Sequence, residues 1–63
     1  MKKYNAWKAK SNGDYIEGTD RLLNGKSKRS ILSHLSYEEG VEYKHDIMIV
    51  RCKDGTMWCV QEV

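Results

Sequence analysis

The most informative stretch of this chain is residues 47–60, which read IMIVRCKDGTMWCV. Two apolar runs flank Asp54-Gly55 there, a dipeptide that supplies the positive φ angles of tight hairpin turns. A second turn signal of the same kind, Asn12-Gly13, lies near the start of the chain. The sequence therefore predicts a β-hairpin on either side of its central segment.

The central segment contains the only helix-like spacing in the chain. Residues 27–35 place apolar side chains at i, i+1 and i+4, which is the spacing of a buried helical stripe. Ser27 is the predicted N-cap and Asn24 the alternative, because both side chains accept free backbone N–H groups. The stripe consists of Ile31, Leu32 and Leu35.

Residues 36–39, which read SYEE, have the spacing of a capping box and are followed by Gly40. They predict a short extra turn after the helix. Residues 41–44 alternate loosely between apolar and polar side chains. We expect them to lead into the second hairpin.

A two-residue turn at Asn12-Gly13 sets the predicted register of the first hairpin. Lys8 then lies opposite Glu17, and such an opposite-charge pair stabilises a hairpin slightly. Trp7 lies opposite Gly18, where the indole covers the space that glycine leaves. Alternation places on one face Trp7, Ala9 and Ile16, and on the other Lys8, Lys10, Tyr15 and Glu17.

The second hairpin differs because both of its predicted faces are apolar. With a two-residue turn, the faces carry Ile47, Ile49, Trp58 and Val60 on one side and Met48, Val50, Cys52, Met57 and Cys59 on the other. A three-residue turn with a bulge at Gly55 shifts this register and still leaves both faces apolar. One helix covers one face only. The second face is then either partly covered by tyrosines and the chain ends, or it is an interface with a second copy or a partner.

Size and composition favour one small folded domain over residues 1–63. The chain is 40% hydrophobic and 32% charged, which is typical of a folded domain rather than a disordered tail. A chain of this length buries only about 60% of the surface that its unfolded form exposes, so we expect marginal stability. The longest apolar run, residues 47–50, is too short to cross a membrane.

The start of the chain and its cysteines indicate a cytoplasmic location. Met1-Lys2-Lys3 is not followed by an apolar stretch, so we expect no signal peptide and a complete small gene product. Cys52 and Cys59 are fewer cysteines than a small secreted scaffold needs. We therefore expect free thiols in a reducing compartment, and no membrane partner.

The net charge of +2 conceals an asymmetry, because residues 1–35 carry +5 and residues 36–63 carry −3. This polarity indicates either an interaction surface or a solvated exterior. The densest basic cluster surrounds the start of the predicted helix, where backbone N–H groups favour anions. A nucleic-acid-binding surface built on this cluster would use Arg21, Lys26, Lys28 and Arg29.

The sequence contains no motif for catalysis, a cofactor or a metal ion. Four residues are of zinc-ligand type but lack the spacing of a zinc site: His34, His45, Cys52 and Cys59. The serines and cysteines show no recognisable nucleophile arrangement. Glu38 and Glu39 are sequence neighbours whose side chains need not converge on one reacting atom. The sequence therefore predicts a non-enzyme without a cofactor.

These features together predict an α+β fold of the type ββαββ. Two hairpins form a mostly antiparallel four-stranded sheet, and one helix packs on it. This plan resembles that of small host-directed proteins of bacteriophages, such as inhibitors of RNA polymerase and anti-CRISPR proteins. The resemblance implies a protein-binding regulator or inhibitor, from a phage or mobile element, that docks on a host protein.

The predicted docking surface is the second hairpin. Its expected anchors are Arg51, Met57 and Trp58, because arginine and tryptophan are typical interface hot spots. Two alternatives stay open. One is nucleic-acid binding by the basic cluster, and the other is a homodimer in which the apolar sheet faces of two copies pack together.

Overall fold

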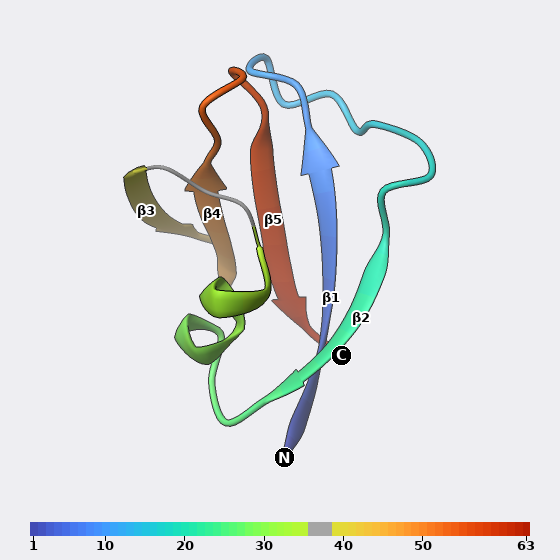
Figure 1. The fold of residues 1–63 in the computed structure, drawn as a ribbon, viewed down its shortest axis with the longest axis vertical. Coiled ribbons are helices and arrows are strands. Elements are labelled where there is room, and N and C mark those ends of the chain that lie inside the picture. The colour runs from blue at the N-terminus through green and yellow to red at the C-terminus, as the bar shows by residue number, and fades with distance from the viewer. Residues whose placement is uncertain (36–38) are drawn as a thin grey trace.

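A computed structural model of the chain describes residues 1–35 and 39–63 (Figure 1). These residues form five strands and one short 3₁₀ helix: β1 (Lys2–Ala9), β2 (Arg21–Gly25), η1 (Arg29–His34), β3 (Glu39–Lys44), β4 (Ile47–Arg51) and β5 (Met57–Glu62). All strands belong to one antiparallel sheet in the order β2-β1-β5-β4-β3. The first and last strands of the chain therefore lie side by side inside the sheet.

The predicted ββαββ plan with a four-stranded sheet and a packed helix is wrong. The sheet has five strands, and the described residues contain only a 3₁₀ helix of six residues. The sequence prediction missed β2 and β3 as strands. It placed both hairpins in one sheet but left open which of their strands meet, and the structure shows that β1 pairs with β5 along six residue positions.

Asn12-Gly13 does form a turn, but the loop has three residues instead of two. The Gly13 N–H donates to the Lys10 carbonyl (2.8 Å), and the Lys10 N–H donates to the Asp14 carbonyl (2.8 Å). Gly13 alone in this loop has a positive φ, of +95°, as in the three-residue loop with glycine in the left-handed position.

This loop shifts the pairing that follows it. Ala9 pairs with Tyr15 in an isolated bridge, so the predicted Lys8–Glu17 and Trp7–Gly18 pairs are wrong. The chain then leaves the sheet and returns as β2, where Leu23 lies opposite Tyr4.

The loop between β4 and β5 has the same three-residue form. The Gly55 N–H donates to the Cys52 carbonyl (3.2 Å), and the Cys52 N–H donates to the Thr56 carbonyl (2.9 Å). The three-residue alternative considered for this turn is therefore the correct one. The resulting register places Val50 opposite Trp58, so the partition of side chains predicted for a two-residue turn is wrong.

One face of the sheet and η1 enclose a single cluster of buried side chains. Its members are Tyr4, Ala6, Ile31, Leu32, Leu35, Met48, Val50, Trp58 and Val60. The predicted helical stripe is thus buried as expected, although the helix type differs. Leu23, Val41 and Cys52 pack against the edge of this cluster.

Serine side chains bond to the backbone at the start of η1 and within it. The Ser27 hydroxyl accepts a hydrogen bond from the Ser30 N–H (3.3 Å), and the Ser30 hydroxyl donates to the Ser27 carbonyl (2.7 Å). The Ser33 hydroxyl donates in the same way to the Ser30 carbonyl (3.4 Å). Residues three apart line up in a 3₁₀ helix, and serine side chains bonded to nearby backbone compete with a regular α-helix. The capping box predicted over residues 36–39 falls largely on residues 36–38, which lie outside the described part of the chain.

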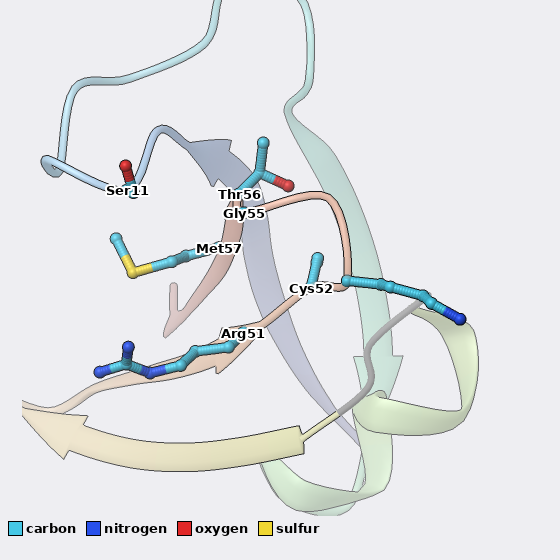
Figure 2. Close-up of a pocket in the computed structure, with 7 residues that line it drawn as sticks. Ser11, Arg51, Cys52, Gly55, Thr56 and Met57 are labelled. Carbon is cyan, nitrogen blue, oxygen red and sulfur yellow. The ribbon is translucent and has the colours of Figure 1, made fainter.

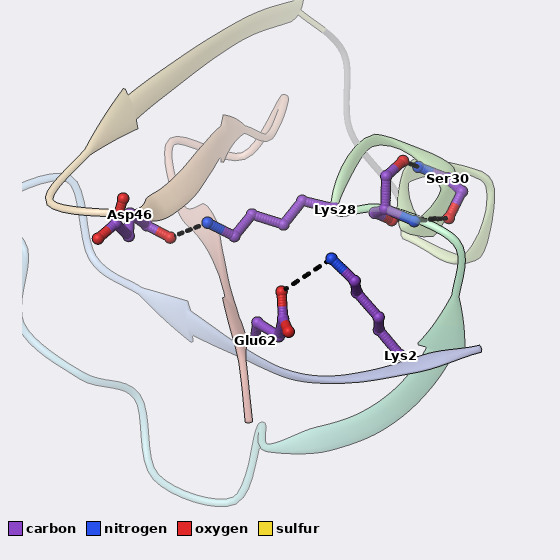
Figure 3. Close-up of polar contacts among 6 residues, drawn as sticks. Lys2, Lys28, Ser30, Asp46 and Glu62 are labelled. Atoms are coloured by element: carbon purple, nitrogen blue, oxygen red, sulfur yellow. Dashed lines mark hydrogen bonds and ion pairs between the residues drawn. The ribbon is translucent and has the colours of Figure 1, made fainter.

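Two contacts hold the ends of these elements together (Figure 3). The Lys28 ammonium donates to the Asp46 carbonyl, which ties the start of η1 to the turn between β3 and β4. The Lys2 ammonium lies 3.6 Å from the Glu62 carboxylate and links the two chain ends. Both partners of this pair are about half exposed, so the pair adds little stability.

The turn between β3 and β4 is a tight two-residue turn without glycine. His45 and Asp46 both have positive φ angles, of 50° and 65°, and Lys44 pairs with Ile47 on either side. Two successive positive φ values define a type I′ turn. No glycine marks this turn in the sequence, and this is why β3 was not predicted.

Gly13→Ala tests the first loop. An added Cβ at Gly13 meets no atom within 4 Å, so the only cost is backbone strain at its positive φ. We expect the free energy of unfolding to fall by roughly 1 kcal/mol, measured by urea denaturation. Ser11→Ala in the same loop is the matched control and should leave stability almost unchanged. Equal stability of Gly13→Ala and the parent would contradict the loop geometry.

The double substitution His45→Asn and Asp46→Gly tests the type I′ turn. It removes the strain of two side chains at positive φ and keeps the carbonyl that binds Lys28. We expect thermal and urea denaturation to show a gain of roughly 0.5–1 kcal/mol. Asp46→Ala keeps a Cβ at positive φ and should give no gain. A loss of stability in the double variant would mean that the native side chains make contacts that matter more than the strain.

Candidate functional site

The face of the sheet that points away from η1 is also apolar, and we call it the outer face. It consists of Trp7, Ala9, Ile47, Ile49, Met57 and Cys59. Trp7 lies opposite Cys59, which lies opposite Ile49, so these three form one row across β1, β5 and β4. Ala9 and Met57 form the neighbouring row.

The outer face is partly open to solvent. Trp7, Ile47, Ile49 and Met57 are half-buried, whereas Ala9 and Cys59 at its centre are buried. Burial raises the pKa of the Cys59 thiol, because the thiolate loses hydration there. The one helix of the described residues covers the opposite face. No helix of the described residues therefore covers the outer face.

Charged and polar side chains surround this apolar centre. Arg51 and Glu42 form an exposed ion pair (2.9 Å) on β4 and β3. On the β1 side, Asp20 accepts hydrogen bonds from the Tyr15 hydroxyl and from the Asn5 amide. The hydrogen bond from Tyr15 to Asp20 also raises the pKa of the tyrosine. Both acidic groups at this rim are thus already engaged.

A hollow of about 330 Å³ lies at the end of the outer face (Figure 2). Arg51 and Met57, which are cross-strand neighbours, extend in the same direction from β4 and β5. Ser11 of the first loop lies across from the Met57 side chain. The hollow thus joins an apolar wall, an arginine and a hydroxyl, which are the groups that hold an apolar side chain next to a carboxylate.

The structure brings together two of the three predicted anchors. Arg51 and Met57 both lie on the outer face and line the hollow. Trp58 is only 3% exposed and lies on the core face. Since neighbouring residues of a strand point to opposite faces, Met57 and Trp58 do not share one surface.

The four residues of the predicted basic cluster do not share a common partner. The Lys28 ammonium binds the Asp46 carbonyl. The Arg21 guanidinium lies 5.1 Å from the centre of the Trp58 ring. Lys26 and Arg29 are exposed near the start of η1. Because η1 has only six residues, it does not supply the long helix N-terminus on which the cluster was based.

The residues of zinc-ligand type do not meet. Cys52 packs at the edge of the core, whereas Cys59 lies on the outer face. Among residues 1–35 and 39–63, no group of three or more histidine, cysteine, aspartate or glutamate side chains is arranged to hold a metal ion. The two cysteines form no disulfide, and their placement on opposite faces of one hairpin explains this.

Sequence reasoning missed the contribution of β1 to the outer face. Trp7 was assigned to a separate hairpin, and the pairing of β1 with β5 places it next to Cys59. Residues 4–9 read YNAWKA, and their apolar members occur at both even and odd positions, which is compatible with a strand that has apolar side chains on both faces. This pattern does not indicate which strand lies beside β1.

Comparison of the chain with models of known families, with curated proteins and with solved structures found no match. In the part of the chain that the structure describes, no helix combines the length and apolar character needed for a membrane crossing. The site must therefore be interpreted from its own geometry.

The reactivity of Cys59 tests the packing of the outer face. In a Cys52→Ser variant, Cys59 is the only thiol. Its raised pKa lowers the fraction present as thiolate, and its burial limits the access of a reagent. We expect iodoacetamide at about pH 8 to modify it about tenfold more slowly in the folded than in the urea-unfolded protein, as followed by mass spectrometry. Adding Ile49→Ala removes a cross-strand neighbour and should raise the folded-state rate. Equal rates in the folded and unfolded states would contradict the burial of this thiol.

Proposed function

We propose that this protein is a small non-enzymatic binding module that regulates another protein by docking on it through the outer face. The observation that carries this proposal is the apolar centre of that face. It spans three neighbouring strands, is half open to solvent and has no helix of the described residues over it. An apolar centre with a polar and charged rim is the usual anatomy of a protein interface.

The size of the apolar centre favours a short segment of a partner as the occupant. The apolar side chains of the outer face come from three neighbouring strands and give a footprint of roughly 200 Å². A standard-size interface buries about 800 Å² on each partner. A second copy of this chain would need a much larger apolar area for a stable dimer. A single strand or helical turn of a partner fits the observed area.

The charges at the rim favour an acidic segment. Glu42 is paired with Arg51, and Asp20 is hydrogen-bonded to Tyr15 and Asn5. Lys3 and Lys44 lie at the other edges of the same face, and neither forms an ion pair within the described residues. Two copies would bring like charges together, whereas carboxylates on a partner would complement these lysines.

Arg51 and Met57 give the partner a defined position. Both side chains of the Arg51–Glu42 pair are exposed. Arg51 can therefore leave Glu42 and bind a carboxylate of the partner at little cost in free energy. An apolar side chain next to that carboxylate would enter the hollow beside Met57. The proposed ligand is therefore a short peptide segment with an apolar residue flanked by aspartate or glutamate.

The phage and mobile-element origin is not part of this proposal. That inference depended on a likeness between the ββαββ plan and small host-directed proteins, and the five-stranded sheet removes its basis. Nucleic-acid binding by Lys26, Lys28 and Arg29 receives no separate support from the contacts of these residues.

Selection of displayed random peptides on the immobilised protein tests the proposal. We expect enrichment of peptides that combine an aromatic or aliphatic residue with neighbouring acidic residues. Ile49→Asp places a charge at the centre of the outer face and should weaken binding of the enriched peptides by about a hundredfold. Tyr43→Asp replaces an exposed aromatic residue outside the outer face and should leave binding unchanged.

Circular dichroism establishes that both variants retain the fold. Selection without enrichment, or enriched peptides that bind Ile49→Asp as well as the parent, would overturn the proposal. Light scattering tests whether a second copy of this chain occupies the outer face. A dimer that Ile49→Asp dissociates would assign the outer face to a second copy and overturn the peptide proposal.

A further inference from the structure

A second hollow, of about 320 Å³, lies at the rim of the core, on the other side of β1 from the outer face. Its walls are Lys8, Gly18, Thr19, Asp20, Arg21 and Trp58. It is independent of the outer face, because Lys8 and Trp58 lie opposite each other on the core side of β1 and β5. Of its walls, only Asp20 also lies at the rim of the outer face, where it binds Tyr15 and Asn5.

Two cations converge on one aromatic ring in this hollow. The Lys8 ammonium lies 5.4 Å and the Arg21 guanidinium 5.1 Å from the centre of the Trp58 ring. Each contact is a favourable cation–π interaction. Lys8 and Arg21 also line the same hollow. An anion in that hollow would therefore interact with both charges.

The protein's own carboxylates satisfy these cations poorly. Arg21 forms no ion pair or hydrogen bond among the described residues, and its neighbour Asp20 is bound to Tyr15 and Asn5 instead. Asp54 lies 3.8 Å from the Lys8 ammonium. The Asp54 carboxylate accepts hydrogen bonds from the N–H (2.9 Å) and hydroxyl (2.5 Å) of Thr56, and mainly these bonds lower its pKa.

The walls of the hollow are held in place before any ligand arrives. The Lys8 N–H donates to the Thr19 hydroxyl oxygen (2.9 Å), and that hydroxyl donates to the Ile16 carbonyl (2.6 Å). These bonds attach the loop before β2 to β1. Gly18 at the mouth has no side chain, and a Cβ there would meet nothing within 4 Å. The hollow is therefore open to a small ligand and needs little rearrangement to bind one.

We infer that this hollow is a binding site for a phosphate group, held between Lys8 and Arg21 at the edge of Trp58. A phosphate monoester carries a charge close to −2 at neutral pH, which two cations match. The planar fork of Arg21 binds two phosphate oxygens, and the Lys8 ammonium binds as a point charge. The phosphate belongs either to a free small molecule or to a nucleic-acid backbone. A backbone phosphodiester also presents two free oxygens to Arg21, but it carries a single negative charge.

Titration with inorganic phosphate, followed by NMR of the Trp58 indole N–H, tests this site. The Trp7→Phe variant assigns the two indole signals. We expect a saturable shift of the Trp58 signal, with binding about fivefold tighter for phosphate than for acetate at equal ionic strength. Arg21→Gln and Lys8→Met should each weaken phosphate binding about tenfold. Lys10→Met removes a lysine that directly follows β1 and does not line the hollow, so it should change the affinity less than about twofold.

Asp54→Asn is expected to increase the affinity for phosphate, in contrast to the variants above. Asparagine keeps an oxygen for the Thr56 N–H and removes the charge that competes for Lys8, so phosphate binding should tighten about threefold. A single-stranded oligonucleotide separates the two sources of phosphate. Binding of the oligonucleotide that is tighter than that of inorganic phosphate and lost in Arg21→Gln supports the site and assigns it to nucleic acid. Shifts that do not saturate, or that persist in Arg21→Gln, overturn the proposal. Peptide binding at the outer face is unaffected by either result.

Discussion

The pairing of β1 with β5 is the interaction on which the rest of this structure depends. It joins the first and last strands of the chain along six residue positions. Without it, the chain would consist of a β1–β2 ribbon and a β3–β4–β5 meander, and each would be marginal alone. Closing a loop that contains almost the whole chain has an entropic cost, which the buried rows centred on Ala6 and Val60 must offset.

The same pairing creates two different faces from one set of strands. On the core side, small Ala6 leaves room for large neighbours, and η1 covers the resulting cluster. On the outer side, Trp7 joins Cys59 and Ile49 into an apolar row that the described residues leave half open. A chain of this size has too few residues to cover both faces of a five-stranded sheet. The half-open outer face is therefore a consequence of the fold.

Trp58 and its two cations show how packing changes the meaning of a residue. In the sequence, Trp58 next to Met57 looks like an exposed interface anchor. In the structure its ring is buried, with Lys8 and Arg21 beside it, and its indole nitrogen has no partner among the described residues. Because lysine and arginine keep their charges in water while their stems pack on apolar surface, the rim of the core becomes basic. The two proposed sites therefore differ in chemistry, although both are built from residues of β1 and β5 in one small sheet.

The sequence by itself determined the local features of this protein. Glycine at positive φ marked two of the loops, the i, i+1, i+4 stripe identified the helical residues that are buried, and the second hairpin was correctly predicted to be apolar on both faces. Local sequence did not reveal the type I′ turn at His45-Asp46, whose strain is tolerated because the flanking strands fix it. Only the tertiary structure decided that β1 lies beside β5, that Trp7 belongs with Ile49, and that Met57 and Trp58 serve opposite faces. Turn residues act through the φ preferences of single residues, which a sequence displays directly. Strand partners and register are chosen by side chains distant in the chain, and one residue more in a loop exchanges the faces of every residue that follows.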